Sequence, residues 1–226
     1  MKLILLPGMD GTGELFEPLL QSLPSSLDPV VVTYPPDRPL GYDQLEELVR
    51  PSLPTDEPFA ILGESFSGPI AISLAASASA NLKALVLSCT FAKNPHPRFA
   101  AMKPLIGAFP AHRMPSMLTG FVMLGSESSE ERRDSLGATL QKVAPEVLRT
   151  RIREVLAVDV TRQLAEIAVP TLYLRAKKDR VVPRSALEEI QRHMLNVQVA
   201  EVDSPHFLLQ VSPVAAAAAI ASLLAR

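Results

Sequence analysis

The sequence predicts an α/β fold, with a mostly parallel sheet of about six strands and helices on both of its faces. Short apolar runs alternate with segments of helical spacing from Lys2 to Ser88, and the alternation returns from residue 169 onward. This order favours parallel strands, because each helix carries the chain back to the start of the next strand. The alternation breaks over residues 91–167, which hold no convincing strand. We therefore predict a core of residues 1–90 and 168–226, interrupted by a helical lid over residues 91–167.

The individual elements follow from local patterns. Continuous apolar or β-branched runs, typical of buried parallel strands, cover Lys2–Leu6, Val30–Tyr34, Phe59–Leu62, Leu82–Ser88, Val169–Arg175 and Val197–Val202. Helices are expected from about Thr12 to Leu23 and over Tyr42–Val49, Pro69–Ala80, Ser128–Val143, Pro145–Val158, Pro183–Met194 and Phe207–Leu224. Pro145 suits the first position of its helix, where a missing N–H costs no hydrogen bond.

Composition narrows the class of function. The net charge of −2 gives no basic excess for binding nucleic acid or an anionic membrane. The single cysteine, Cys89, excludes an intrachain disulfide and fits a reducing compartment, so we expect a cytoplasmic protein. Cys89 lies in an apolar run and is interpreted as buried filler. The apolar run after Lys2 stops at Pro7 without a signal-peptide pattern, and no apolar stretch is long enough to span a bilayer.

The stretch Gly63-Glu-Ser65-Phe-Ser67-Gly68 carries the strongest chemical signal. It lies between an apolar strand and a helix, and it approximates the G-x-S-x-G turn that lifts a nucleophilic serine off a sheet. Ser67 replaces the second glycine, either as a tolerated small group or as the source of an extra hydrogen bond within the turn. The alternative is that small residues here only let a helix approach a strand.

A serine nucleophile needs a histidine base and a group that orients that base. The chain has four histidines: His96, His112, His193 and His206. Only His206 follows a predicted strand, and Asp179 follows the strand before it. Loops after parallel strands share one edge of the sheet, so Ser65, Asp179 and His206 are predicted to meet there, in the chain order serine, acid, histidine.

Each assignment has an alternative. His206 could cap or pack beneath the last helix, and Asp179 could cap a helix or pair with neighbouring lysines and arginines. Asp203 competes as the orienting acid, although its closeness to His206 in the same loop makes the pairing awkward. Asp159, at the end of the insertion, is a further competitor. Glu64 is expected to face away from the apex into supporting contacts.

An oxyanion requires backbone N–H donors at the same edge of the sheet. The Phe66 N–H directly follows the nucleophile, and Gly8 lets the chain turn after the first strand so that the Met9 N–H is the natural second donor. The alternative for the glycine-rich stretch Gly8–Gly13 is a phosphate-binding loop. That stretch lacks the Lys-Ser/Thr of a P-loop and the spacing of a dinucleotide-binding fingerprint.

Four motifs in this order resemble the α/β-hydrolase superfamily over essentially the whole chain. Leu6-Pro7-Gly8-Met9 is similar to the oxyanion loop, Gly63–Gly68 to the nucleophile elbow, and Ala176–Pro183 to the acid loop. His206, with Pro213 seven residues later, is similar to the histidine loop. The resemblance implies an α/β-hydrolase fold in which the insertion is a lid over the site. It is greatest to small, lidded carboxylesterases, including those that cleave methyl esters of carrier-bound acyl chains.

The sequence departs from the family pattern in three places. Pro7 stands where a histidine is common, Ser67 where a glycine is common, and the antiparallel N-terminal hairpin is absent because the first strand begins at residue 2. All three triad candidates are retained. A serine at position 65 argues against haloalkane dehalogenase or epoxide hydrolase chemistry, which needs a carboxylate there.

We therefore expect hydrolysis of a small-molecule carboxylic ester or thioester, with neither a cofactor nor a metal. An apolar supply in the insertion suits an acyl chain: Phe99, Met102, Leu105, Ile106, Phe109, Met114, Met117, Leu118, Phe121 and Met123. Ordinary packing of the lid on the core is the better explanation for most of these positions taken individually. Five arginines could meet an acidic acyl carrier protein or a carboxylate, although a solvated helix face is the simpler interpretation: Arg132, Arg133, Arg149, Arg151 and Arg153. An acyltransferase, a lactonase and a non-catalytic binding protein on this fold are the alternatives.

Overall fold

The computed structural model describes residues 1–77, 80–108, 130–194 and 196–225. Its centre is a six-stranded sheet of order β2-β1-β3-β4-β5-β6, with every neighbouring pair parallel. The strands are β1 (Lys2–Leu6), β2 (Asp28–Val31), β3 (Phe59–Glu64), β4 (Leu82–Ser88), β5 (Thr171–Ala176) and β6 (Val197–Val202). The predicted α/β class and parallel sheet are confirmed.

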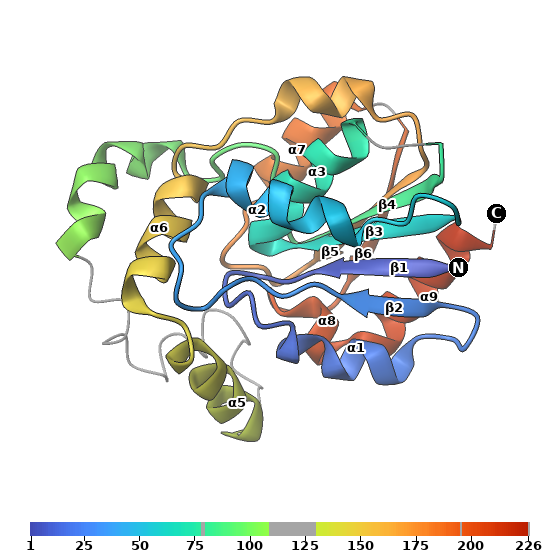
Figure 1. Ribbon diagram of the computed structural model, residues 1–226, viewed down its shortest axis with the longest axis horizontal. Helices are drawn as coiled ribbons and strands as arrows, with labels where there is room; N and C mark the ends of the chain where they lie inside the picture. The colour runs from blue at the N-terminus through green and yellow to red at the C-terminus, as the bar shows by residue number, and fades with distance from the viewer. Residues whose placement is uncertain (78–79, 109–129, 195, 226) are drawn as a thin grey trace.

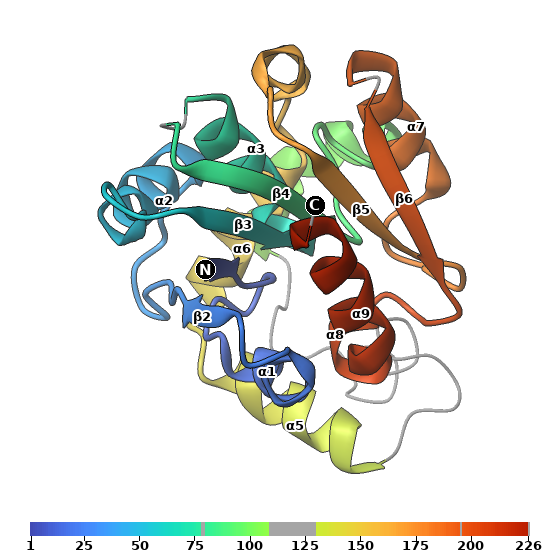
Figure 2. The ribbon, with the colours of Figure 1, turned by 90° about the vertical axis from the view of Figure 1, so that its right-hand side faces the viewer.

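Helices cover both faces of this sheet (Figures 1 and 2). One face carries α1 (Glu17–Ser22), α8 (Leu208–Val211) and α9 (Pro213–Leu224), and the other carries α2 (Tyr42–Val49), α3 (Gly68–Ala76) and α7 (Arg184–His193). Successive strand side chains point to opposite faces. The side chains of Leu3 and Leu5 of β1 therefore join the apolar cluster on the face that carries α1, α8 and α9. Those of Ile4 and Leu6 join the apolar cluster on the face that carries α2, α3 and α7. Burial on both faces is why these strands are continuously apolar.

The strand order reverses beside β1, which lies between β2 and β3. The helix that follows β1, α1, and the helix that follows β3, α3, pack on opposite faces of the sheet. Open α/β sheets bind ligands at such a switch point, outside the carboxyl ends of the strands. The loop after β1 and the turn after β3 are the two segments that carry the predicted oxyanion donors and the predicted nucleophile.

The chain between β4 and β5 contains 3-10 helix η4 (Pro97–Ala108), α5 (Glu130–Gln141), α6 (Pro145–Val155) and 3-10 helix η5 (Thr161–Glu166). Figure 1 shows α5 and α6 beyond the ends toward which the strands point. Among the described residues of 91–167 there is no named strand, only a single bridge between Lys93 and Asp159. Helix η5 packs against α3 and α7, because Leu164 belongs to the apolar cluster on that face of the sheet. The division into core and lid stays a prediction.

Several helix and strand boundaries differ from the sequence prediction, and two of these differences have a clear physical reason. The helix predicted over Phe207–Leu224 is divided into α8 and α9 at Ser212, whose φ of −128° and ψ of 51° are not helical. Pro213 lacks an N–H and disfavours the helical conformation in the residue before it. Strand β2 ends at Val31, and the Tyr34 N–H instead donates to the carbonyl of Gly11 at 2.7 Å. Among the described residues, no helix combines the length and apolar character needed to cross a membrane.

Candidate active site

The turn after β3 holds Ser65 in a strained conformation. Its φ of 47° lies in the left-handed region that few non-glycine residues adopt. A Cβ added to Gly63 would lie 2.6 Å from the Ala71 Cβ, and one added to Gly68 would lie 1.8 Å from Thr90 Oγ1, so both positions require glycine. The Thr90 hydroxyl donates to the carbonyl of Ser65. The apex is therefore fixed by close packing and by a hydrogen bond from the end of β4.

Ser65, His206 and Asp179 lie in one hydrogen-bonded line. Ser65 Oγ is 2.9 Å from His206 Nε2, and His206 Nδ1 is 3.0 and 2.9 Å from the two carboxylate oxygens of Asp179. An ionised carboxylate only accepts hydrogen bonds, so Nδ1 carries the proton and donates it. The other ring nitrogen, Nε2, is then left to accept a hydrogen bond from the Ser65 hydroxyl.

Asp179 is held as an ionised acceptor by its own loop. Its Oδ1 accepts the Val181 and Val182 N–H groups at 2.8 and 2.9 Å. Burial acts to raise the pKa of Asp179, but the hydrogen bonds from His206 and from these two amides outweigh it and leave the pKa below its ordinary value. The loops after β5 and β6 are also joined by the Lys178 N–H, which donates to the Ser204 carbonyl at 3.0 Å.

The competing residues lie elsewhere. Asp203 is exposed and pairs with Lys178 at 3.0 Å, and Asp159 accepts hydrogen bonds from the Thr161 N–H and hydroxyl. The other histidines are also occupied or not described: His96 Nε2 is 2.7 Å from the Val181 carbonyl, His193 Nε2 is 3.4 Å from Glu189, and His112 lies outside the described residues. The structure thus brings together the three residues that the sequence selected.

The two predicted oxyanion donors lie directly after two strands that are neighbours in the sheet. Met9 lies in the loop after β1, and Phe66 lies in the turn after β3. Within the part of the chain that the structure describes, the Met9 N–H donates no hydrogen bond. The Phe66 ring stacks on Tyr42, with centroids 4.8 Å apart, and its carbonyl accepts the Tyr42 hydroxyl at 3.0 Å. The role of these N–H groups stays a prediction.

Ser67 joins the two loops. Its Oγ is 2.7 Å from the Tyr34 hydroxyl and donates to the Pro7 carbonyl. The two positions that depart from the family pattern, Pro7 and Ser67, are therefore bonded to each other. Of the two alternatives that the sequence left open for Ser67, a tolerated small group or an extra hydrogen bond within the turn, neither matches fully, because the hydroxyl bonds to the loop after β1. No sequence spacing indicated this contact or the part played by Tyr34.

Glu64 lies in supporting contacts, as the sequence predicted. It is 6% exposed, and its Oε1 accepts the amide of Gln210 at 2.9 Å. Burial raises the pKa of Glu64 to about 7, against the opposing effects of the Gln210, His206 and Gly8 groups nearby. Glu64 thus lies beneath both the oxyanion loop and the histidine.

The arginines of the insertion do not share one environment. Arg149 and Arg153 are partly exposed and pair with Glu146 at 3.3 and 2.9 Å, which fits a solvated helix face. Arg151 is only 1% exposed and turns toward the oxyanion loop, so the solvated-face interpretation is wrong for it. The side chains of Arg132 and Arg133 lie outside the described residues.

The apolar supply of the insertion is only partly described. Phe99 is 41% exposed and Ile106 is 8% exposed. The other side chains named for an acyl site lie outside the described residues: Met102, Leu105, Phe109, Met114, Met117, Leu118, Phe121 and Met123.

Cys89 approaches the triad closely enough to raise the question of a metal. In the described residues, the ligand atoms of Cys89, Asp179 and His206 lie within 4.8 Å of one another. Burial raises the pKa of the Cys89 thiol well above its ordinary value, and the thiol donates to the Leu174 carbonyl at 3.8 Å. Asp179 and His206 already bond to each other. Both ring nitrogens of His206 and both carboxylate oxygens of Asp179 are thus occupied by contacts within the protein.

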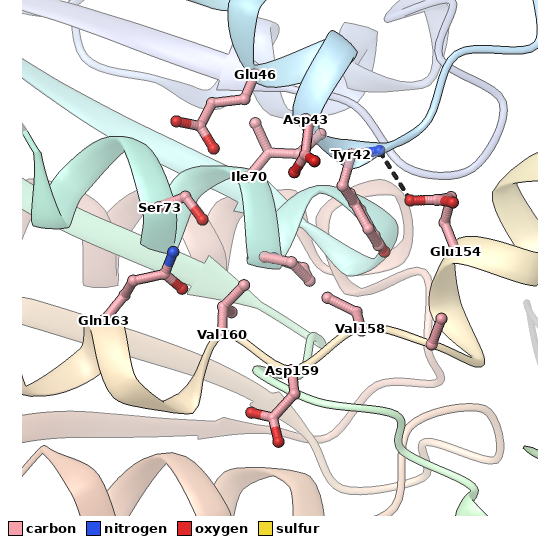
Figure 3. Close-up of a pocket in the computed structure, with 12 residues that line it drawn as sticks. Tyr42, Asp43, Glu46, Ile70, Ser73, Glu154, Val158, Asp159, Val160 and Gln163 are labelled. Carbon is pink, nitrogen blue, oxygen red and sulfur yellow. Dashed lines mark hydrogen bonds between the residues drawn. The ribbon is translucent and has the colours of Figure 1, made fainter.

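A cavity of about 280 Å³ lies away from these residues, between α2, α3 and the chain after α6 (Figure 3). Its lining includes four carboxylates, but three of them already accept hydrogen bonds from the protein. Glu154 accepts the Tyr42 N–H at 3.0 Å, Glu46 accepts from Arg50, and Asp159 accepts from Thr161. Ser65, Asp179 and His206 are not among its lining residues.

The fold defines the class of the protein, which is an α/β-hydrolase. The family model described as "Serine aminopeptidase, S33" matches residues 42–203, more than half of the chain, so the chain belongs to that family. Family membership makes the protein a hydrolase. A search of curated proteins finds no match.

Solved structures share the whole fold at low sequence identity. An enol-lactonase from Burkholderia xenovorans LB400 aligns with a TM-score of 0.83 and 15% identity, covering 100% of this chain and 91% of that one. A bromoperoxidase from Bacillus anthracis gives 0.82 and 17%, covering 100% and 92%. The esterase EaEST from Exiguobacterium antarcticum gives 0.81 and 18%, covering 100% and 92%. Likeness at these identities concerns the fold, and it gives no support to an acyl carrier protein as partner.

Proposed function

We propose that the protein is a serine hydrolase that cleaves small-molecule carboxylic esters or thioesters through an acyl-enzyme. The observation that carries the proposal is the line from Ser65 Oγ through His206 to Asp179, with contacts of 2.9 to 3.0 Å at the switch point of the sheet. The strained apex at Ser65 and membership of a hydrolase family support the same assignment.

The proposed reaction uses each group once in each half. His206 Nε2 takes the Ser65 proton as Oγ attacks the acyl carbon, and Asp179 stabilises the imidazolium that forms. The Met9 and Phe66 N–H groups hold the oxyanion. His206 then gives its proton to the leaving alcohol or thiol as the acyl bond to it breaks. In the second half His206 deprotonates a water, which attacks the acyl carbon, and His206 returns this proton to Ser65 Oγ as the acyl–oxygen bond breaks and the acid is released.

We propose residues 91–167 as the lid over this site, since α5 and α6 lie beyond the carboxyl ends of the strands (Figure 1). The partly exposed Phe99 in this segment suits an apolar acyl group. The same triad would open a lactone, whose leaving alcohol stays attached, or pass the acyl group to an alcohol. It would also cleave an amide, the class of bond that the family name, serine aminopeptidase, indicates for other members.

The test is a substrate panel run on the wild type and two serine variants. The panel contains p-nitrophenyl esters with acyl chains of two to ten carbons, a γ-lactone and an amino-acid p-nitroanilide. Comparing the rates on these three classes shows which kind of bond the protein cleaves. Added methanol, followed by product analysis, distinguishes hydrolysis from transfer. We expect ester hydrolysis to fall by about 10³-fold or more in Ser65→Ala, and to be unchanged in Ser52→Ala, an exposed serine on η2 (Arg50–Ser52). Undiminished hydrolysis in a folded Ser65→Ala protein would refute the proposal. Unchanged circular dichroism would show that both variants fold.

A further inference from the structure

The aim of the Met9 N–H depends on the shape of one turn. In a planar trans peptide the N–H points opposite to the carbonyl of the preceding residue. The direction of the Met9 N–H is therefore fixed by the Gly8 carbonyl, which accepts the Gly11 N–H at 3.1 Å. Gly11 has a φ of 71°, so the turn depends on a conformation that favours glycine. Contacts that fix the conformation of this turn therefore also fix the direction in which the Met9 N–H points.

Arg151 fastens the middle of the turn. Its Nη1 donates to the carbonyls of Met9 and Asp10 at 2.7 and 2.9 Å, and its Nη2 donates to the Pro35 carbonyl at 3.3 Å. A Cβ added to Gly11 would lie 2.7 Å from Arg151 Nη1, so the turn is in close contact with the guanidinium. A single side chain thus bonds to the two peptide groups that follow Met9, which lie directly after the peptide group that carries the Met9 N–H.

The environment of Arg151 is a costly one for a charge. The side chain is 1% exposed, burial lowers its pKa, and Asp10 offsets only part of that effect. Its Nε is buried and has no partner in the described part of the chain. An apolar residue of similar size would fill the space without burying a charge, so stability alone gives a weak reason for an arginine here. The arginine supplies the pair of hydrogen bonds to the turn, a hydrogen bond to the Pro35 carbonyl, and a charge 5.6 and 5.9 Å from the ring centroids of Tyr34 and Phe66.

Arg151 belongs to α6, which is docked on the core by further contacts. The Met9 side chain packs with Val147 and Leu148 of that helix. The Ala144 N–H, just before α6, donates to the Pro36 carbonyl at 2.8 Å. Near the other end of the helix, Glu154 accepts the Tyr42 N–H, a contact drawn in Figure 3. The position of α6 is therefore transmitted to the oxyanion loop through Arg151.

We propose that Arg151 is a positioning residue for the oxyanion hole, through which α6 sets the aim of the Met9 N–H. The inference rests on the proposed function. It means that docking of α6 and completion of the oxyanion hole are one event. A protein with α6 displaced keeps Ser65, His206 and Asp179 in line and loses transition-state stabilisation. Arg151 itself makes no contact with the reacting atoms.

The experiment compares Arg151→Met with Arg153→Met, a partly exposed arginine of the same helix that pairs with Glu146. Three quantities are measured: kcat and KM for a nitrophenyl ester, the inhibition constant of a trifluoromethyl ketone, and hydrogen exchange of a peptide containing residues 8–12. In Arg151→Met we expect kcat to fall about 10- to 100-fold, because a donor is misdirected rather than deleted. KM should stay within about twofold. The ketone forms a tetrahedral adduct, so its inhibition constant should rise by about the same factor as kcat falls. Hydrogen exchange of residues 8–12 should accelerate. Arg153→Met should change none of the three.

Arg151→Lys is the second variant. It keeps the charge and the stem but cannot supply the fork of donors, so we expect a smaller loss of kcat than in Arg151→Met. A folded Arg151→Met protein with wild-type kcat, or with only KM changed, would overturn the inference even if exchange accelerates. Failure of both variants to fold would also overturn it, because Arg151 would then serve the fold. Ser65→Ala run alongside separates the two proposals. A wild type without Ser65-dependent turnover overturns the proposed function and the inference with it, whereas full turnover in Arg151→Met overturns the inference alone.

Discussion

The two halves of the candidate site are held in different ways. The half that carries Asp179 and His206 is local, because β5 and β6 are neighbours and the Asp179 carboxylate bonds to its own loop and to His206. The half that carries Met9 depends on distant segments. Arg151 reaches it from α6, and Ser67 reaches it from the turn after β3.

The histidine base and the proposed oxyanion hole are therefore held in place by different segments of the chain. Changes in α6 should impair the stabilisation of the transition state and leave the Ser65–His206–Asp179 line intact. Changes in the loops after β5 and β6 should impair the base and leave the loop after β1 intact. A lid that controlled the reaction by moving α6 would therefore act on the oxyanion loop.

The largest effect that tests this separation is expected for Asp179→Asn. The amide no longer fixes the histidine proton on Nδ1, so kcat/KM should fall by about 10³- to 10⁴-fold in steady-state ester hydrolysis. Hydrogen exchange of residues 8–12 should stay at the wild-type rate, in contrast with Arg151→Met.

Asp203→Asn is the matched control. Asp203 is exposed and pairs only with Lys178 among the contacts described, so the change should leave kcat/KM within about twofold. Severe loss in Asp203→Asn with a mild effect in Asp179→Asn would mean that the acid is Asp203. Faster exchange of residues 8–12 in Asp179→Asn would remove the separation between the halves.

A smaller effect, on the free energy of unfolding, is expected when Glu64, which lies between the two halves, is replaced by glutamine. The folded protein binds a proton there more tightly than the unfolded chain does, since burial raises the pKa from 4.5 to about 7. The stability that this proton provides is full below pH 4.5 and is lost as the pH rises through about 7. A shift of this size corresponds to about 3 kcal/mol. Glu64→Gln is neutral throughout, so its free energy of unfolding relative to wild type should rise by up to about 3 kcal/mol between pH 4.5 and pH 8.

Urea unfolding at several pH values measures this difference, and Glu47→Gln, an exposed carboxyl on α2, is the control. An offset between Glu64→Gln and wild type that is the same at pH 4.5 and pH 8 would contradict the raised pKa. A pH-dependent offset in Glu47→Gln as large as that in Glu64→Gln would assign the effect to surface charge.

The sequence predicted the half of the site that local rules determine. Strand periodicity placed Ser65, Asp179 and His206 after three strands of one parallel sheet, β3, β5 and β6, and such loops must share an edge of the sheet. The elbow was recognisable despite Ser67, because the turn needs small residues and the chain supplies them. The break between α8 and α9 was missed, although Pro213 signalled it.

The contacts of the oxyanion loop could not be predicted in the same way. Ser67 and Pro7 are distant in sequence and lie on different loops, so no local pattern links them. Arg151 carried a usable signal, since it is four and three residues after Val147 and Leu148 and therefore shares their buried face. Grouping it with Arg149 and Arg153 by charge alone hid that spacing. Its partners are backbone carbonyls, which no side-chain pattern reveals.

The most direct test of the central claim is the reaction of the folded protein with a fluorophosphonate, read by intact mass and peptide mapping. Such a reagent traps an activated serine as a stable adduct. We expect one adduct per chain, on Ser65, in wild type and in Asp203→Asn, and none in Ser65→Ala. Absence of an adduct in wild type, or an adduct on another residue that persists in Ser65→Ala, would contradict it.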